Sequence, residues 1–197
     1  MDLEYFQNLL KHKVPHALTR YGDGEWKIFD NANCNRKGFK FNSKLDQNFR
    51  RELIKSYMHK NKNYYVADKE PISACVFVNE NHLKFLKIVG LFNLFPVIFI
   101  GNEKAKVGNL KFKIDAFYPV LNNAWRYHPN LHEELLKEIS SHKMPCLVLF
   151  ACGPYSNVLI YKIWSKNKNN ILWNIGSVFD PHLFGKNTRK YHERLSE

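Results

Sequence analysis

Residues 146–164, CLVLFACGPYSNVLIYKIW, hold the pattern that decides the fold. The run from Cys146 to Ala151 is short and continuously apolar, which is typical of a strand buried on both faces of a sheet. A Cys-Gly-Pro turn at residues 152–154 ends this run, and a helix is expected from Ser156 to Trp164. The stretch therefore predicts a strand, a tight turn and a helix, which together are the repeating unit of an α/β fold.

Short apolar runs of the same kind recur along the chain and predict further strands. Five more are expected, at His16–Arg20, Tyr64–Ala67, Val97–Ile100, Ala116–Val120 and Ile171–Ile175. Helical patterns lie between these runs, because apolar residues recur every third or fourth position from Leu45 to Tyr57 and from Leu131 to Ile139. Strands that alternate with helices predict an α/β fold, a Rossmann-like three-layer sandwich with a mostly parallel sheet.

Capping residues predict where some of these helices begin. Ser43 is the expected N-cap of the helix that contains Leu45, and Asn130 with Glu133 has the spacing of a capping box. A longer helix is expected from Ser73 to Phe92, where leucine and isoleucine provide the apolar face.

The length and composition indicate one domain. The 197 residues are 45% hydrophobic, which is enough to build a packed core, and no internal repeat or low-complexity linker divides them. We therefore expect a single domain over residues 1–197, with a loose basic tail from about residue 186 onward.

The charge balance indicates anionic partners. Lysine and arginine number 30 against 18 aspartate and glutamate residues, so the formal net charge is +12. Phosphates, nucleic acid or an anionic surface are the expected ligand classes. Only 7 of the 30 basic residues are arginine, the residue type that reads base edges, so sequence-specific nucleic-acid binding is not expected. The lysine excess has an alternative explanation in the base composition of the genome.

The sequence also bears on the cellular compartment. The four cysteines form no C-x-x-C motif and are expected to be reduced thiols. Residues 1–10 lack the basic start and apolar core of a signal peptide. The most apolar stretch, residues 88–100, is short of the roughly 20 residues that a membrane-spanning helix needs. We therefore expect a cytoplasmic protein without a transmembrane segment.

Four of the expected strands end in a loop that contains glycine. These loops are Gly22-Asp23-Gly24-Glu25, Gly101-Asn102-Glu103-Lys104, Cys152-Gly153-Pro154, and Gly176-Ser177 running to Asp180. An open parallel sheet binds its ligand at the carboxyl ends of its strands. Each glycine also has a purely structural explanation, because a strand needs a tight turn to lead into a helix. Four such loops at one edge favour a ligand site there.

The first of these loops has the most informative chemistry. Asp23 and Glu25 are separated by Gly24 and preceded by Gly22, and an extended loop of this composition can turn both carboxylates to the same side. Carboxylate oxygens are the ligands that Mg²⁺ and Mn²⁺ prefer, and these ions share oxygens with a bound phosphate. Arg20 can add a fixed charge for the same diphosphate. The alternative is a solvated turn, because a D-x-E pattern is common by chance.

Other motifs and residues narrow the chemistry further. The chain has no G-x-x-x-x-G-K-[ST], G-x-G-x-x-G or G-x-S-x-G motif, which argues against P-loop, simple dinucleotide and serine-hydrolase sites. Lys104, and Arg189 with Lys190 if the tail folds back, are the cations expected to meet a pyrophosphate. Trp125 is either a core residue or a platform on which a base or sugar stacks.

Four segments at the strand ends carry a family resemblance. They are RYGDGE at residues 20–25, IGNEK at 100–104, LVLFACGP at 147–154 and NIGSVFDP at 174–181. With these segments the chain resembles the GT-D fold glycosyltransferases, small single-domain enzymes with a D-x-E metal motif after the first strand, over nearly its whole length. One position departs from the family pattern, because Asn174 stands where an aspartate is expected.

The resemblance implies a reaction. A sugar would pass from a nucleotide diphosphate donor, expected to be a UDP-sugar, to a hydroxyl of a glycan or other acceptor, with Mn²⁺ or Mg²⁺ bridging Asp23, Glu25 and the diphosphate. Glu103 and Asp180 are candidates for the base that takes the acceptor proton. The expected donor-binding residues are Arg20, Gly22, Gly24, Gly101, Asn102, Lys104, Gly153, Pro154 and Arg189.

Two other functions remain open at this point. The net charge and the aromatic residues are also compatible with a non-catalytic module that binds nucleic acid or another polyanion. The same carboxylate pair is compatible with a metal-dependent phosphoesterase or nucleotidyltransferase.

Overall fold

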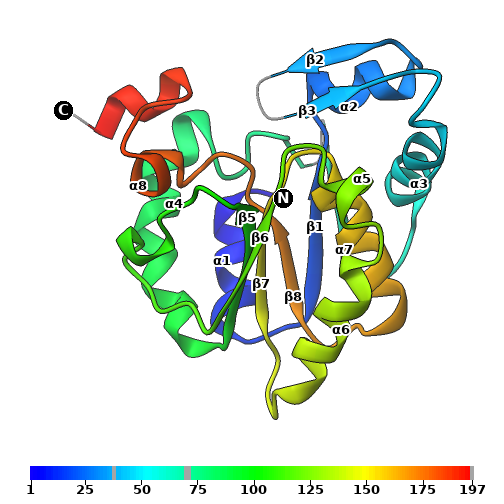
Figure 1. The fold of residues 1–197 in the computed structure, drawn as a ribbon. Coiled ribbons are helices and arrows are strands. Elements are labelled where there is room, and N and C mark those ends of the chain that lie inside the picture. Colours follow the sequence, from blue (N-terminus) through cyan, green and yellow to red (C-terminus); the bar gives the residue numbers. More distant parts are fainter. Residues whose placement is uncertain (37–38, 69–71, 196–197) are drawn as a thin grey trace.

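A computed structural model describes residues 1–36, 39–68 and 72–195. Its centre is a six-stranded parallel sheet with the order β4-β1-β8-β7-β5-β6 (Figure 1). The strands are β1 (His16–Arg20), β4 (Tyr64–Ala67), β5 (Val97–Asn102), β6 (Ala116–Val120), β7 (Leu147–Ala151) and β8 (Ile171–Asn174). All six coincide with the predicted apolar runs to within two residues at either end, so the predicted parallel α/β sheet is confirmed.

Helices connect the strands. They are α1 (Leu3–Lys11), α2 (Asp23–Phe29), α3 (Gln47–Met58), α4 (His82–Ile88), α5 (Ala124–Tyr127), α6 (Leu131–Ser141), α7 (Tyr155–Lys166) and α8 (Asp180–Phe184). Four 3₁₀ helices are η1 (Asn79–Asn81), η2 (Val89–Leu94), η3 (Val107–Asn109) and η4 (Lys190–Leu195). A separate antiparallel hairpin, β2 (Cys34–Arg36) with β3 (Phe39–Phe41), lies between α2 and α3.

Two hydrophobic clusters, one on each face of the sheet, make the three layers of the sandwich. Successive side chains of β5 alternate between them: Ile98 and Ile100 pack in the cluster that includes α3, α6 and α7, and Val97 and Phe99 pack in the cluster that includes α1, α4 and η2. Figure 1 shows α6 and α7 on one side of the sheet and α1 and α4 on the other. A strand buried on both faces has to be apolar throughout, which explains the continuous runs in the sequence.

Three local predictions are wrong. The helix predicted after Ser43 begins at Gln47 with Asp46 as its N-cap, and Leu45 lies before the helix with 77% of its surface exposed. Asn130 is the N-cap of α6, but its side chain makes no capping hydrogen bond. The helix predicted over residues 73–92 is α-helical only from His82 to Ile88. Asn79, with a left-handed φ of 55°, interrupts a helix before His82, and Val89–Leu94 continues as the 3₁₀ helix η2.

The C-terminal segment also differs from its prediction as a loose tail. Residues 186–195 turn back toward α8, and η4 packs against α4, with His192 fully buried. Figure 1 shows this segment next to α8 at the end of the molecule that carries the strand carboxyl ends. Residues 196–197 of the predicted tail lie outside the described residues.

The structure also bears on the predictions for the cysteines, for Trp125 and for membrane-spanning helices. All four cysteines are free thiols, as predicted. Trp125 is a core residue, because its ring stacks on Phe49 at 4.2 Å and its Nε1–H donates to Asp46, so it offers no platform to a base or sugar. Within the described ranges, no helix combines the length and apolar character that crossing a membrane requires.

Candidate functional site

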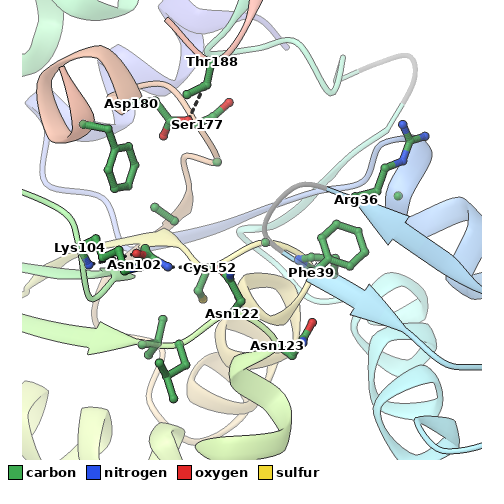
Figure 2. A pocket seen from close by; sticks show the side chains of 18 of the residues that line it. Arg36, Phe39, Asn102, Lys104, Asn122, Asn123, Cys152, Ser177, Asp180 and Thr188 are labelled. Carbon is green, nitrogen blue, oxygen red and sulfur yellow. Dashed lines mark hydrogen bonds between the residues drawn. The ribbon is translucent and has the colours of Figure 1, made fainter. Parts of the chain in front are cut away.

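A cleft of about 1100 Å³ opens at the carboxyl ends of the strands. Its lining comes from the loops that follow β1, β5, β6, β7 and β8, together with the hairpin and the C-terminal segment. In the sheet, β5 leads to β6 on one side and β7 leads to β8 on the other, so the connections change direction between β5 and β7, whose following loops both line the cleft. Such a change of direction leaves a crevice that binds ligands in open α/β sheets. Figure 2 shows side chains from these segments around the cleft.

The cleft collects most of the residues that were predicted to form a site. Those that line it are Asp23, Gly24, Glu25, Asn102, Glu103, Lys104, Gly153, Pro154, Asp180 and Arg189. The predicted site residues outside the lining are Arg20, Gly22 and Gly101. Gly101 has a packing explanation, because a Cβ atom there would lie 2.6 Å from the ring of Phe99.

Asp23 and Glu25 lie on a helix and not on the extended loop that was predicted. Gly22 is the N-cap of α2, and both carboxylates belong to the first turn. The Glu25 carboxylate turns back and accepts the backbone N–H of Gly22 at 3.0 Å, which is half of a capping box. The first N–H groups of a helix have no partner within the helix and favour negative charge, so the D-G-E sequence forms a helix start.

The two carboxylates differ in environment. The Asp23 side chain is 92% exposed and lies 4.0 Å from the guanidinium of Arg36, an exposed pair that adds little stability. Glu25 is half-buried, and this burial raises the pKa of its carboxyl group. The Gly22 N–H and the nearby Arg20 charge oppose the rise in pKa, whereas the Asp23 charge adds to it. Asp23 is therefore the exposed carboxylate of the pair, and Glu25 is the more buried one.

The donor set is compatible with a divalent cation. Asp23 and Glu25 both line the cleft, and the exposed Asp23 carboxylate has acceptor capacity beyond its one distant ion pair. Among the described residues, no group of three or more His, Cys, Asp or Glu side chains could hold a metal. Mg²⁺ and Mn²⁺ sites with one or two carboxylates take their other ligands from water and substrate phosphates, and two carboxylates fit that pattern.

Arg20 lies beneath the cleft and connects two loops. Its Nε donates to the Ala74 carbonyl at 2.8 Å and its Nη1 to the Ile175 carbonyl at 3.2 Å. A Cβ atom on Gly176, which lines the cleft, would lie 3.2 Å from this Nη1. Burial lowers the pKa of the Arg20 guanidinium. Arg20 is therefore held below the β8–α8 loop and does not line the cleft, and its contact with a diphosphate stays a prediction.

Two buried asparagines join the ends of β1 and β8 to α7. The Asn157 side chain accepts the backbone N–H of Arg20 at 3.0 Å and donates to the Arg20 carbonyl at 2.8 Å. Asn174 donates from Nδ2 to Asn157 Oδ1 at 2.8 Å, and its own Oδ1 accepts the Gly176 N–H at 3.2 Å. Asn174 therefore acts both as donor and as acceptor, so the loop over Arg20 depends on an amide at this position.

The hairpin contributes Arg36 and Phe39, which the sequence pattern did not indicate. The Phe39 ring packs over the two glycine loops: a Cβ atom would lie 2.8 Å from it at Gly24 and 3.7 Å from it at Gly153. Gly153 also has a left-handed φ of 64°. Figure 2 shows Phe39 and Arg36 on the same side of the cleft. Gly24 is thus required for the approach of an aromatic ring, next to the carboxylates it separates.

Replacing Gly24 with Ala should therefore displace Phe39. We expect the variant to lose about 1 kcal/mol of folding free energy, the low end for overpacking, because the half-buried ring can rotate away. For a chain of this size, such a loss corresponds to a fall of about 2–4 °C in melting temperature. Thermal denaturation measures it.

The matched control is Gly90→Ala, because a Cβ atom at Gly90 meets nothing within 4 Å. Adding Phe39→Leu to Gly24→Ala should recover part of the lost stability. If Gly24→Ala and Gly90→Ala have the same melting temperature, the ring does not depend on this glycine.

Polar side chains form the wall opposite the hairpin. Asn102 donates to Asn122 at 3.2 Å and accepts the Lys104 N–H at 3.0 Å, and the Glu103 N–H binds the Val120 carbonyl. Glu103 and Lys104 are both exposed on the cleft. The ends of β5 and β6 therefore present one carboxylate and one cation on an ordered turn.

The third wall consists of α8 and the C-terminal segment. Asp180 accepts a hydrogen bond from the Thr188 hydroxyl, as Figure 2 shows, and Arg189 lines the cleft next to Thr188. The C-terminal segment therefore folds back and brings Arg189 to the cleft, as a role for Arg189 requires. Ser177, Thr188 and Asn122 had no signal of their own in the sequence: only their position after strand ends distinguishes Ser177 and Asn122, and Thr188 reaches the cleft because the C-terminal segment folds back.

Cys152 also lines the cleft but is not a nucleophile. Burial raises the pKa of its thiol to about 12, and the thiol contacts the Ser156 hydroxyl at 3.3 Å. A protonated thiol is a weak nucleophile.

Comparisons with solved structures identify the fold. One, described as the highly conserved domain of unknown function 1792 with a distinct glycosyltransferase fold, has a TM-score of 0.60 at 15% identity, covering 92% of this chain and 80% of that chain. A second, described as a new glycosyltransferase of the same domain type from Streptococcus sanguinis, has a TM-score of 0.59 at 14% identity, covering 90% and 81%. No protein-family model and no curated protein matches the sequence. The chain thus has the fold described as a glycosyltransferase fold.

Proposed function

We propose that this chain is a glycosyltransferase that moves a sugar from a nucleotide diphosphate donor, with a UDP-sugar as the expected donor, to a hydroxyl of a glycan or other acceptor. One observation carries the proposal: a single cleft of the glycosyltransferase fold contains the carboxylates of Asp23 and Glu25 together with the cations Lys104 and Arg189. Lys104 and Arg189 are both exposed on this cleft, so an anionic ligand can reach both.

The residues have distinct roles in this reaction. Asp23 and Glu25 would hold Mn²⁺ or Mg²⁺, which when bound stabilises the charge that develops on the departing nucleoside diphosphate. Lys104 and Arg189 bind and orient the diphosphate and add positive potential near the same oxygens. The amide side chains of Asn102 and Asn122 give the cleft additional hydrogen-bonding groups for the sugar.

Glu103 is the favoured base for the acceptor hydroxyl. It is exposed on the cleft, and its backbone N–H is fixed to Val120. The other candidate, Asp180, accepts the Thr188 hydroxyl, which supports a role in holding the C-terminal segment. The cleft volume of about 1100 Å³ is at the upper end of ligand pockets, which supports binding of a donor and an acceptor together.

A thermal-shift screen tests the function. UDP-, GDP-, ADP- and dTDP-sugars are added with and without Mn²⁺, and a UDP-sugar with Mn²⁺ should raise the melting temperature. A ligand at 100 times its Kd stabilises the native state by about 2.7 kcal/mol. For a chain of this length, that corresponds to a rise of roughly 5–10 °C. The shift should disappear in an Asp23→Asn, Glu25→Gln variant.

The control variant is Asp30→Asn, which removes a carboxylate at the end of the same helix and outside the cleft. Binding to DNA or RNA that falls steeply with salt and survives loss of Asp23 and Glu25 would instead support the polyanion-binding module. Release of inorganic phosphate from the donor, without transfer of sugar, would support a phosphoesterase.

A further inference from the structure

The C-terminal segment, residues 186–195, forms a wall of the cleft through Lys186, Thr188 and Arg189. It is attached to the loop between β8 and α8 at several points. The Tyr191 hydroxyl contacts the Ser177 hydroxyl at 2.8 Å, and the Thr188 hydroxyl donates to Asp180. Ser177 and Asp180 line the cleft themselves. The attachment points of the segment are therefore next to any ligand in the cleft.

His192 is the buried centre of this attachment. Its Nδ1 accepts the backbone N–H groups of Thr188 at 3.1 Å and Arg189 at 3.3 Å. Its Nε2 lies 3.0 Å from the Ser177 carbonyl oxygen, which can only accept, so Nε2 carries the proton. Two donors converge on Nδ1, and this nitrogen must therefore be unprotonated. The backbone fixes both the neutral state and the tautomer of His192.

Three observed features disfavour a proton on Nδ1. The proton would point at the two backbone N–H groups of Thr188 and Arg189, and it would place a positive charge on a fully buried ring. The titratable and charged side chains that act on His192 are His82 of α4, whose ring lies at 5.4 Å, His182 of α8, and Arg189. The elements η1 and α4, which pack against η4, also carry exposed charged side chains: Glu80 on η1, and Lys84 and Lys87 on α4.

We propose that His192 is a positioning residue, which in its neutral form holds residues 186–195 as a fixed wall and thereby directs Arg189 to the phosphates of an anionic ligand. The backbone N–H of Arg189 binds His192, so the starting point of the arginine side chain is fixed. The residue is exposed, and its Nη1 makes a long contact of 3.5 Å to the Thr188 carbonyl. The identity of the ligand as a nucleotide diphosphate rests on the proposed function, whereas the attachment of the wall does not.

Attachment of the wall by neutral His192 should depend on pH. Burial, followed by the nearby His82, lowers the pKa of His192 to about 4 from an ordinary value of 6.5. A histidine with a lowered folded-state pKa favours folding in its neutral form, so its contribution is complete above pH 6.5 and declines as the pH falls toward 4. The wall should therefore detach over that range.

Hydrogen exchange tests the wall without any ligand. In His192→Phe, which keeps a ring but no nitrogen, the backbone amides of residues 186–195 should exchange at least about 10-fold faster at pH 7, and β7 should not change. His192→Asn keeps an acceptor and should restore part of the protection. In the native protein, protection of this segment should fall as the pH is lowered from 6.5 to 4. In His192→Asn, any fall in protection that remains over this pH range comes from the titration of His82 or His182.

The matched control is His142→Phe, which changes a histidine at the end of α6, outside the cleft. Protection within twofold of the native protein in His192→Phe would overturn the anchoring role of His192.

Binding of inorganic pyrophosphate, measured by calorimetry, tests the role of Arg189. Loss of a charge-assisted hydrogen bond should weaken binding about 10-fold or more in Arg189→Gln. His192→Phe should weaken it similarly, and the double variant should be no weaker than Arg189→Gln, because both changes remove one interaction. Additive losses, or no binding by the native protein, would overturn the positioning of Arg189. Pyrophosphate binding with this pattern but no response to any nucleotide sugar would contradict only the proposed function.

Discussion

Replacing Asp23 with Asn and Glu25 with Gln, singly or together, should lower sugar transfer by about 100- to 1000-fold, the range seen when a preorganised electrostatic group is lost. Both residues line the cleft and belong to the first turn of α2, so their carboxylates can contribute to one cation site. The double variant should be little worse than either single variant, because two ligands of one cation act as a unit. Steady-state kinetics with the donor found in the thermal-shift screen measures the effect.

The amide replacements are chosen because they keep the fold. In Glu25→Gln, the amide oxygen of the new side chain can still accept the Gly22 N–H, so the start of α2 is preserved while the charge is removed. The control Asp30→Asn should keep full activity. Native activity in Asp23→Asn, or equal activity of the native protein with and without divalent cations, would contradict the metal-site hypothesis.

The pH profile gives an independent check on Glu25. Burial raises the pKa of this carboxyl group, so the ionised form that can bind a cation is lost at a higher pH than for an exposed glutamate. Metal affinity should therefore fall as the pH is lowered toward this raised pKa. In Glu25→Gln, that limb of the profile should be absent.

Asn174→Asp should destabilise the protein by about 3 kcal/mol or more at pH 7, the cost of leaving an uncompensated charge in the interior. Asn174 is buried, and its Nδ2 donates to the side-chain oxygen of Asn157 and, at 3.5 Å, to the Arg20 carbonyl. A carboxylate oxygen in the place of Nδ2 would face two acceptors. The loss should decrease as the pH falls, because a protonated carboxyl group can donate again. Urea denaturation at pH 7 and pH 4.5 measures both effects.

Asn169→Asp is the matched control, because it makes the same change of charge at an exposed position. The outcome also bears on the resemblance to GT-D enzymes, in which an aspartate is expected at position 174. If Asn174→Asp were as stable as the native protein and more active, the missing carboxylate would be a functional loss and not an adaptation to Asn157.

The sequence predicted the sheet well because burial on both faces leaves a strong signal. Runs such as Val97–Ile100 and Leu147–Ala151 are apolar at every position, and few other structures require this. The hairpin left no such signal. Its strands have three residues each, and only Cys34 and Phe41 are buried, so neither composition nor period distinguishes them from a loop.

The residues of the candidate site were predicted from their positions at the ends of strands. This explains which predicted residues line the cleft and which do not. Loops at the carboxyl edge of a parallel sheet meet, so Asp23, Lys104 and Gly153 line one cleft as expected. The position of a residue at a strand end does not determine which way its side chain points. Arg20 is at a strand end, but its guanidinium turns below the loop to two carbonyl groups. Arg189 required a tertiary contact, the buried His192, that local sequence cannot predict.

The strand order has a consequence for folding kinetics. β8 lies between β1 and β7, so the pair β1–β4 and the trio β5, β6 and β7 meet only through a strand made from residues 171–174. On the ribosome, neither half of the sheet can complete its edge until this late segment emerges. Contacts between residues so distant in sequence slow the search for the native state. The nascent chain should therefore wait with two unpaired strand edges, at β1 and β7, which makes it a natural substrate for chaperones.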